Sequence, residues 1–161
     1  ITRCAAVSAP VDLVSASASL ERRSNFFYNR RFVRKLYRKA CDTMAAQPGT
    51  IDTAGFARVR CLRDYDEQYT APMGGYSSSM HYYEAASSRS YISSIAVPVL
   101  LINAQDDPFL GPGCYPLSEA RSSGNFFFEC PPHGGHIGFI LFGDKQEYWH
   151  ETRVADFLTG R

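Results

Sequence analysis

The chain has 161 residues, of which 45% are hydrophobic and 14% aromatic, so it has the size and the apolar content of a single folded domain. Its formal net charge is +1, which excludes the overall basic excess typical of nucleic-acid-binding proteins. The longest apolar stretch, residues 97–102, is much shorter than the roughly 18 residues of a membrane-spanning helix and suits a buried strand.

The five cysteines are odd in number and widely spaced, and no two of them form a C-x-x-C pair. This pattern favours reduced thiols in a cytoplasmic protein over a zinc site or a disulfide framework. We therefore predict no metal site and no cofactor. The cysteines are Cys4, Cys41, Cys61, Cys114 and Cys130.

The chain begins inside an apolar pattern. Residues 3–8 predict a short strand, and the "APVDL" that follows predicts a turn. Because the first residue, Ile1, already belongs to this pattern, we expect the chain to be a fragment of a longer protein.

The next part of the chain is mainly helical in pattern. Apolar residues at four-residue spacing (Phe32, Leu36, Ala40 and Met44) predict a helix over residues 20–46, which "QPG" ends. A second helical stretch is predicted over residues 55–66. "YTAPMGGYSS" predicts a loop because of its Pro, Gly and Ser content, and "MHYYEAASS" predicts a short helix.

The last part of the chain alternates strands with helices. "VPVLLINA" at residues 97–104 is a continuous apolar run of the kind that is buried on both faces of a parallel sheet. "NFFFEC" at residues 125–130 predicts another strand, and residues 117–121 predict a helix before it. "QEYWHETRVADFL" predicts a closing amphipathic helix. Alternation of this kind indicates an α/β fold with a parallel sheet. The inner face of the closing helix is expected to comprise Trp149, Val154, Phe157 and Leu158.

Chemically useful side chains follow two of the predicted strands. "QDDPFL" comes directly after "VPVLLINA", and "PPHGGH" comes directly after "NFFFEC". Functional residues of parallel sheets gather past the carboxyl ends of the strands. An acid and then a histidine in these positions is the order of the last two members of an α/β-hydrolase triad. Separately, each motif has a simpler explanation: Asp-Asp-Pro forms turns, and a histidine beside glycines can lie on an exposed loop.

Six segments spread in order over nearly the whole chain carry a resemblance to a known family: "AVSAPVDL", "NFFYNRRFVRKLYRK", "LRDYDEQYTAP", "YYEAASS", "VPVLLINAQDDPF" and "HGGHIGF". In these segments the sequence resembles the YheT-like branch of the α/β-hydrolases, bacterial relatives of the abhydrolase-domain lipases and esterases. The resemblance implies that residues 1–161 form the C-terminal portion of one α/β-hydrolase domain. Residues 15–90 would then be a helical cap-like insertion, and residues 95–161 the last strands and helices.

The resemblance also implies which residues are catalytic. Asp107 and His136 take the positions of the acid and the histidine, and Asp106 is the weaker candidate for the acid. The nucleophilic serine of such enzymes lies in a G-x-S-x-G elbow, a motif that this chain lacks. Ser77 lacks the closing glycine, Ser8 has no flanking glycines, and no neighbour in sequence would activate the thiol of Cys114. We expect this chain alone to be inactive.

The helical stretch after the first strand is rich in basic and aromatic residues. It can be a solvated helix face, a cap surface that contacts an anionic membrane, or a nucleic-acid-binding element. The balanced charge of the whole chain disfavours the last. The residues are Arg22, Arg23, Arg30, Arg31, Arg34, Lys35, Arg38 and Lys39, interleaved with Phe26, Phe27, Tyr28, Phe32, Leu36 and Tyr37.

Two functions follow from the sequence. In the first, the chain supplies the Asp and His of a Ser-His-Asp triad in a serine hydrolase that acts on small-molecule esters, including lipid esters. Its partner is then the missing N-terminal half of the same fold, with a peripheral membrane contact as a further possibility and no nucleic acid. In the second, it is a non-catalytic, truncated hydrolase-fold domain for protein interaction or lipid-surface binding.

Overall fold

A computed structural model describes residues 1–49, 52–140 and 148–161. The chain divides into two compact units. Residues 1–16 and 87–161 form the sheet unit, and residues 17–86 form the helical unit. No helix within the described ranges combines the length and the apolar character needed to cross a membrane.

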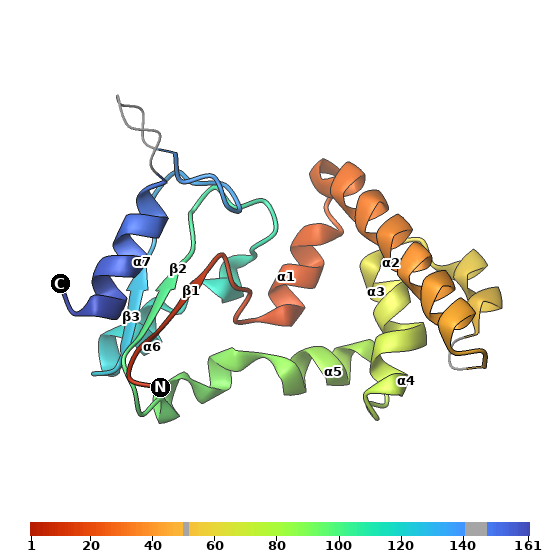
Figure 1. The fold of residues 1–161 in the computed structure, drawn as a ribbon, viewed down its shortest axis with the longest axis horizontal. Helices are drawn as coiled ribbons and strands as arrows, with labels where there is room; N and C mark the ends of the chain where they lie inside the picture. The colour runs from red at the N-terminus through yellow and green to blue at the C-terminus, as the bar shows by residue number, and fades with distance from the viewer. Residues whose placement is uncertain (50–51, 141–147) are drawn as a thin grey trace. The chain divides into compact units, whose positions relative to one another are not determined.

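The sheet unit is built on three parallel strands that lie side by side (Figure 1). They are β1 (Cys4–Val7), β2 (Val99–Ile102) and β3 (Phe126–Glu129), in the order β1-β2-β3. In register, Val99 pairs with Cys4 on one side and with Phe126 on the other. The α/β class and all three predicted strands are therefore confirmed, with each strand slightly shorter than its sequence pattern.

The central strand β2 is buried on both faces, as its unbroken apolar sequence predicts. Because side chains alternate along a strand, Leu100 and Ile102 contribute to one apolar cluster and Leu101 to another. The first cluster also contains Phe157 of helix α7 (Trp149–Thr159). The second contains Ile92 of the 3₁₀ segment η4 (Ser88–Ser94). The sheet is thus covered on both faces, which leaves its carboxyl edge free for function.

The closing helix is confirmed, with one error in its inner face. Phe157 belongs to the first of the two apolar clusters, hereafter the sheet cluster, and Trp149 and Val154 pack against it. Leu158, in contrast, is 44% exposed. Leu158 directly follows the buried Phe157, and the rotation of about 100° per residue turns it toward the solvent. The predicted start of this helix, residues 146–147, lies outside the described residues.

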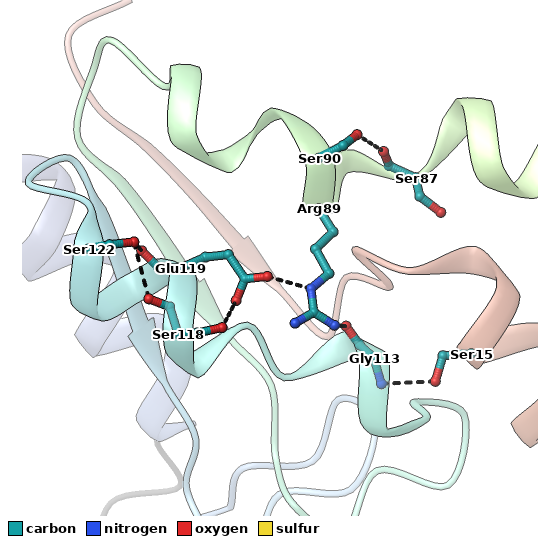
Figure 2. A network of polar contacts seen from close by, with 8 residues as sticks. All are labelled: Ser15, Ser87, Arg89, Ser90, Gly113, Ser118, Glu119 and Ser122. Atoms are coloured by element: carbon teal, nitrogen blue, oxygen red, sulfur yellow. Dashed lines mark hydrogen bonds and ion pairs between the residues drawn. The ribbon is translucent and has the colours of Figure 1, made fainter.

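A polar network joins several segments of the sheet unit (Figure 2). Arg89 of η4 pairs with Glu119 of α6 (Leu117–Ser122) at 2.5 Å and also donates to the carbonyl of Gly113. Gly113 lies in η5 (Pro112–Cys114), and its N–H donates to the hydroxyl of Ser15. Arg89 thereby connects η4 to both η5 and α6, and the bond from Gly113 extends the network to Ser15 near the start of the chain.

The helical unit contains the longest helix of the described residues, α2 (Phe26–Ala46), drawn in orange in Figure 1. It is preceded by α1 (Leu13–Leu20), which starts in the sheet unit, and by η1 (Arg23–Asn25). After it come η2 (Thr53–Arg58), α3 (Leu62–Tyr65), η3 (Asp66–Thr70), α4 (Ala71–Met73) and α5 (Ser79–Ala86).

Several helix boundaries differ from the sequence predictions. The helix predicted to begin near residue 20 begins at Phe26, and a separate helix, α1, precedes it. The serine-rich sequence of α1 has low intrinsic helix propensity, but Asp12 accepts the N–H of Ser15 and so caps the first turn of α1. The predicted stretch over residues 55–66 is interrupted at residues 59–61. The loop predicted over residues 69–78 is helical as far as Met73.

Candidate active site

The loops that follow β2 and β3 meet at the carboxyl edge of the sheet. The N–H of Gln105, just past β2, donates to the carbonyl of Pro131, just past β3, at 2.9 Å. Asn103, the first residue after β2, is fully buried, and its side-chain amide donates to the carbonyls of Ala9 and Cys114. These contacts fasten the two loops to each other and to the segment after β1.

Asp107 and His136 lie in contact at this edge. The distance between Nδ1 of His136 and Oδ2 of Asp107 is 2.9 Å, within the range of a charge-assisted hydrogen bond. The carboxylate side chain is fully buried, whereas the imidazole is 38% exposed. The structure therefore brings together the two residues that sequence reasoning selected, and it is Nδ1 of the ring that contacts the acid.

The local structure holds the acid in a single orientation. The second carboxylate oxygen of Asp107 accepts the N–H of Phe109 at 2.9 Å, which closes a turn over Pro108. The ring of Phe109 packs edge-on against the imidazole of His136, with 4.7 Å between centroids. Both carboxylate oxygens of Asp107 are thus used: one closes the turn and the other contacts the histidine. Sequence reasoning did not identify Phe109.

The neighbouring pair, Asp106 and His133, is more exposed. The side chain of His133 is 89% exposed, and its Nδ1 lies 3.5 Å from a carboxylate oxygen of Asp106. The other oxygen of Asp106 accepts the N–H of Gly135 at 2.8 Å. Asp106 therefore stabilises the backbone of the histidine loop and does not contact the ring of His136.

Two glycines shape the histidine loop. A Cβ on Gly134 would lie 2.5 Å from ring atoms of Phe139 and 3.0 Å from Cβ of Ala104, so only glycine fits there without a shift. Gly135 has a φ of +55°, in the left-handed region that glycine adopts at no steric cost. Buried Phe139 anchors the far side of the loop, and its carbonyl accepts the N–H of Trp149. Leu141 and Phe142, which continue the apolar sequence after Phe139, lie outside the described residues.

Ser8, the first residue after β1, also contacts the histidine loop. It is buried and has a φ of +53°, which is unusual for a residue other than glycine. Its N–H donates to the carbonyl of Ile102, and its hydroxyl donates to the backbone carbonyl of His136. Sequence reasoning considered Ser8 only as a nucleophile and missed this contact. The signal available was its position at a third strand end.

The other two candidates for the nucleophile, Cys114 and Ser77, lie in surroundings that do not favour a reactive nucleophile. Cys114 is fully buried, and burial raises the pKa of its thiol, which disfavours the reactive thiolate. The hydroxyl of Ser77 lies 3.1 Å from Nδ1 of His81, but both residues are exposed, and within the described residues no acid forms an ion pair with this histidine. Within the described ranges, no serine hydroxyl contacts Nε2 of His136.

Comparison with known proteins identifies close relatives in sequence. The YheT protein of Escherichia coli is 35% identical over 95% of this chain and 46% of its own length. The medium-chain fatty acid ethyl ester synthase/esterase 2 of Saccharomyces cerevisiae is 38% identical over 62% of this chain and 22% of its own length. A monoacylglycerol lipase of the same yeast is 33% identical over 63% of this chain and 22% of its own length.

The chain therefore spans about half of the length of YheT, or less of the other curated relatives that it matches. The aligned part is the C-terminal part of those proteins. No protein-family model matches the chain, and no solved structure matches it significantly.

Proposed function

Because the chain belongs to the YheT-like branch of the α/β-hydrolase superfamily, we propose that it supplies the acid and the histidine of a Ser-His-Asp triad in a carboxylic ester hydrolase. The observation that carries this proposal is the 2.9 Å contact between His136 and the fully buried carboxylate of Asp107. The contact joins two loops at the edge of a parallel sheet where such enzymes perform their chemistry.

In the proposed reaction the two residues have different roles. His136 acts as the general base: Nε2 takes the proton of the nucleophilic serine as its oxygen attacks the ester carbonyl, and the ring then gives the proton to the leaving alcohol. Asp107 accepts a hydrogen bond from Nδ1–H, which fixes the tautomer that leaves Nε2 free to accept. Within the described residues Nε2 of His136 forms no hydrogen bond, and the partial exposure of the ring keeps it accessible.

The serine and the oxyanion hole are assigned to the part of the protein outside this chain, because no G-x-S-x-G occurs in it. Residues 15–90 are proposed as the cap-like insertion of the domain and residues 95–161 as its last strands and helices. The names of the relatives, an ethyl ester synthase/esterase and a monoacylglycerol lipase, favour fatty-acyl esters as the substrate class. The five free thiols favour a reducing compartment such as the cytoplasm.

A fluorophosphonate probe on the full-length protein tests the proposal, since the probe reacts only with an activated serine. We expect the wild-type protein to be labelled on the serine of a G-x-S-x-G motif and the His136→Ala variant to be labelled far more slowly. A folded full-length protein that is neither labelled nor able to hydrolyse short-chain p-nitrophenyl esters would instead indicate the non-catalytic interaction domain.

A further inference from the structure

Helix α2 has two faces of opposite character. Its inner face carries the partly buried Phe32, Val33 and Leu36 and the buried Ala40. Its outer face carries Phe27, Arg31, Arg34 and Arg38 at spacings of four, three and four residues, with Lys35 beside them. Residues at these spacings lie on one face of a helix, so the four side chains form a straight stripe about 16 Å long.

The stripe is exposed, and its cations are not neutralised locally. Each of Arg31, Arg34, Lys35 and Arg38 is exposed, and none takes part in an ion pair with any residue of the described ranges. The one acid of α2, Asp42, lies beyond the stripe, about one turn after Arg38. A solvated helix face commonly alternates charges of both signs, whereas this one presents a single sign.

Phe27, at one end of the stripe, is an apolar ring in water. It is 82% exposed, and its neighbour Phe26 is 56% exposed. The two rings pack edge to face on each other, with centroids 5.6 Å apart, and not against a buried cluster. A pair of exposed phenylalanines beside a row of arginines is the composition of a helix that lies in a membrane interface.

We propose that the outer face of α2 binds the surface of an anionic phospholipid membrane. The helix lies parallel to the surface. Arg31, Arg34, Lys35 and Arg38 contact the phosphate groups, and Phe27 enters the boundary between headgroups and acyl chains. This goes beyond the proposed hydrolase function and does not depend on it, because every residue involved belongs to the helical unit.

A hollow beside the stripe fits the same occupant. It has a volume of about 520 Å³, and Arg30 and Arg34 line it together with Val33, Tyr37 and Phe56. Two guanidinium groups next to apolar and aromatic side chains suit a molecule with an anionic head and an apolar tail. A lipid headgroup bound to Arg30 and Arg34 could place its glycerol backbone on Tyr37 and Phe56.

A membrane surface accounts for the exposed aromatic ring better than a nucleic acid does. Phosphates of a duplex would pair with the arginines but leave Phe27 in water, whereas the lipid interface accommodates both. A planar surface also contacts all members of a straight stripe at once. Each cation near an anionic surface strengthens binding by about fivefold at moderate ionic strength, so three together account for about a hundredfold.

Co-sedimentation of the full-length protein with vesicles tests the proposal. We expect binding to vesicles of phosphatidylcholine with phosphatidylglycerol, much weaker binding to phosphatidylcholine alone, and a decline with added salt. The triple variant Arg31→Gln, Arg34→Gln, Arg38→Gln should bind the anionic vesicles about a hundredfold more weakly. The matched control, Arg60→Gln, Arg121→Gln, Arg161→Gln, removes three exposed cations elsewhere and should bind like the wild type.

A tryptophan at the stripe gives a second readout. In Phe27→Trp, the fluorescence emission of the new tryptophan should shift to shorter wavelength when anionic vesicles are added, because its indole ring enters the membrane interface. In the control Met73→Trp, at a side chain 67% exposed on α4, it should not shift. Absence of vesicle binding by the folded wild type, equal binding by the two triple variants, or binding to an oligonucleotide duplex but not to vesicles would each overturn the proposal. Fluorophosphonate labelling, measured in parallel, reports on the hydrolase function separately.

Discussion

The carboxylate of Asp107 lies 2.9 Å from Nδ1 of His136 and is fully buried, while the neighbouring Asp106 contacts the exposed His133 at 3.5 Å. The two acids are adjacent in sequence, and the two histidines are three residues apart. Their surroundings nevertheless differ in the property that matters for proton transfer, because only a fixed, desolvated carboxylate strongly stabilises an imidazolium. The two histidines therefore provide a matched test within one loop.

We expect His136→Ala in the full-length enzyme to lower kcat/KM for a short-chain p-nitrophenyl ester by about 10³-fold or more, because it removes the general base. His133→Ala should lower it by at most about tenfold, since an exposed residue that only shapes the loop takes no part in proton transfer. Steady-state kinetics on both variants, after circular dichroism has shown that each folds, compares them. A larger loss for His133→Ala would show that His133, and not His136, performs the proton transfer.

Ser8 is expected to position the histidine loop. Ser8→Ala removes the hydroxyl that donates to the carbonyl of His136, a loss of about 1 kcal/mol of loop stabilisation. We predict a decrease in kcat of at most about tenfold, with KM nearly unchanged and with fluorophosphonate labelling retained. Ser8→Cys, which keeps a weak donor, should restore part of the rate. Loss of all labelling in Ser8→Ala would make Ser8 the nucleophile and contradict its positioning role.

Gly134 is expected to tolerate no side chain. In Gly134→Ala the new Cβ would overlap the ring of Phe139, a buried residue of the sheet cluster, and would press on Ala104. Overpacking of this kind costs about 1–3 kcal/mol. We predict a lower thermal midpoint together with a loss of esterase activity, because the displaced loop carries His136. Gly124→Ala is the control, since a Cβ there meets open space; equal effects of the two substitutions would refute the steric explanation.

The ion pair between Arg89 and Glu119 predicts a pH dependence of stability. The hydrogen bond from Arg89, followed by that from Ser118, lowers the pKa of Glu119 to about 2. Because the pKa is depressed in the folded state, the stabilisation is complete above the unfolded pKa of about 4.3 and is lost as the pH falls toward 2. Both side chains are partly exposed, so solvent screening limits the contribution to about 1 kcal/mol.

Urea unfolding of Glu119→Gln and of the wild type at pH 7 and pH 3 measures this contribution. The free energy of unfolding of the wild type should exceed that of Glu119→Gln by the whole contribution at pH 7 and by a smaller amount at pH 3. Glu84→Gln, at an exposed glutamate of α5, is the matched control and should change stability little at either pH. A difference that is the same at both pH values would show that Glu119 stabilises the protein by packing and not by its charge.

Much of the sheet unit is predictable from the sequence. The run Val99–Ile102 is apolar without interruption because both of its faces are covered, and burial on both faces is itself the mark of a central parallel strand. The chemistry of the site is also visible, since "QDDP" and "HGGH" follow consecutive strands whose carboxyl ends must share one edge. The resemblance to the hydrolase family then favours Asp107 over Asp106.

Only the tertiary structure decided the remaining features, because they depend on contacts between distant segments. Adjacent residues of a turn point in different directions, so the separate partners of Asp106 and Asp107 follow from the packing of two loops and not from local pattern. The contact of Ser8 with His136 spans 128 residues and has no periodicity to reveal it. Likewise, the outward direction of Leu158 depends on which surface of α7 the sheet covers, and hydrophobic spacing predicts that surface only approximately.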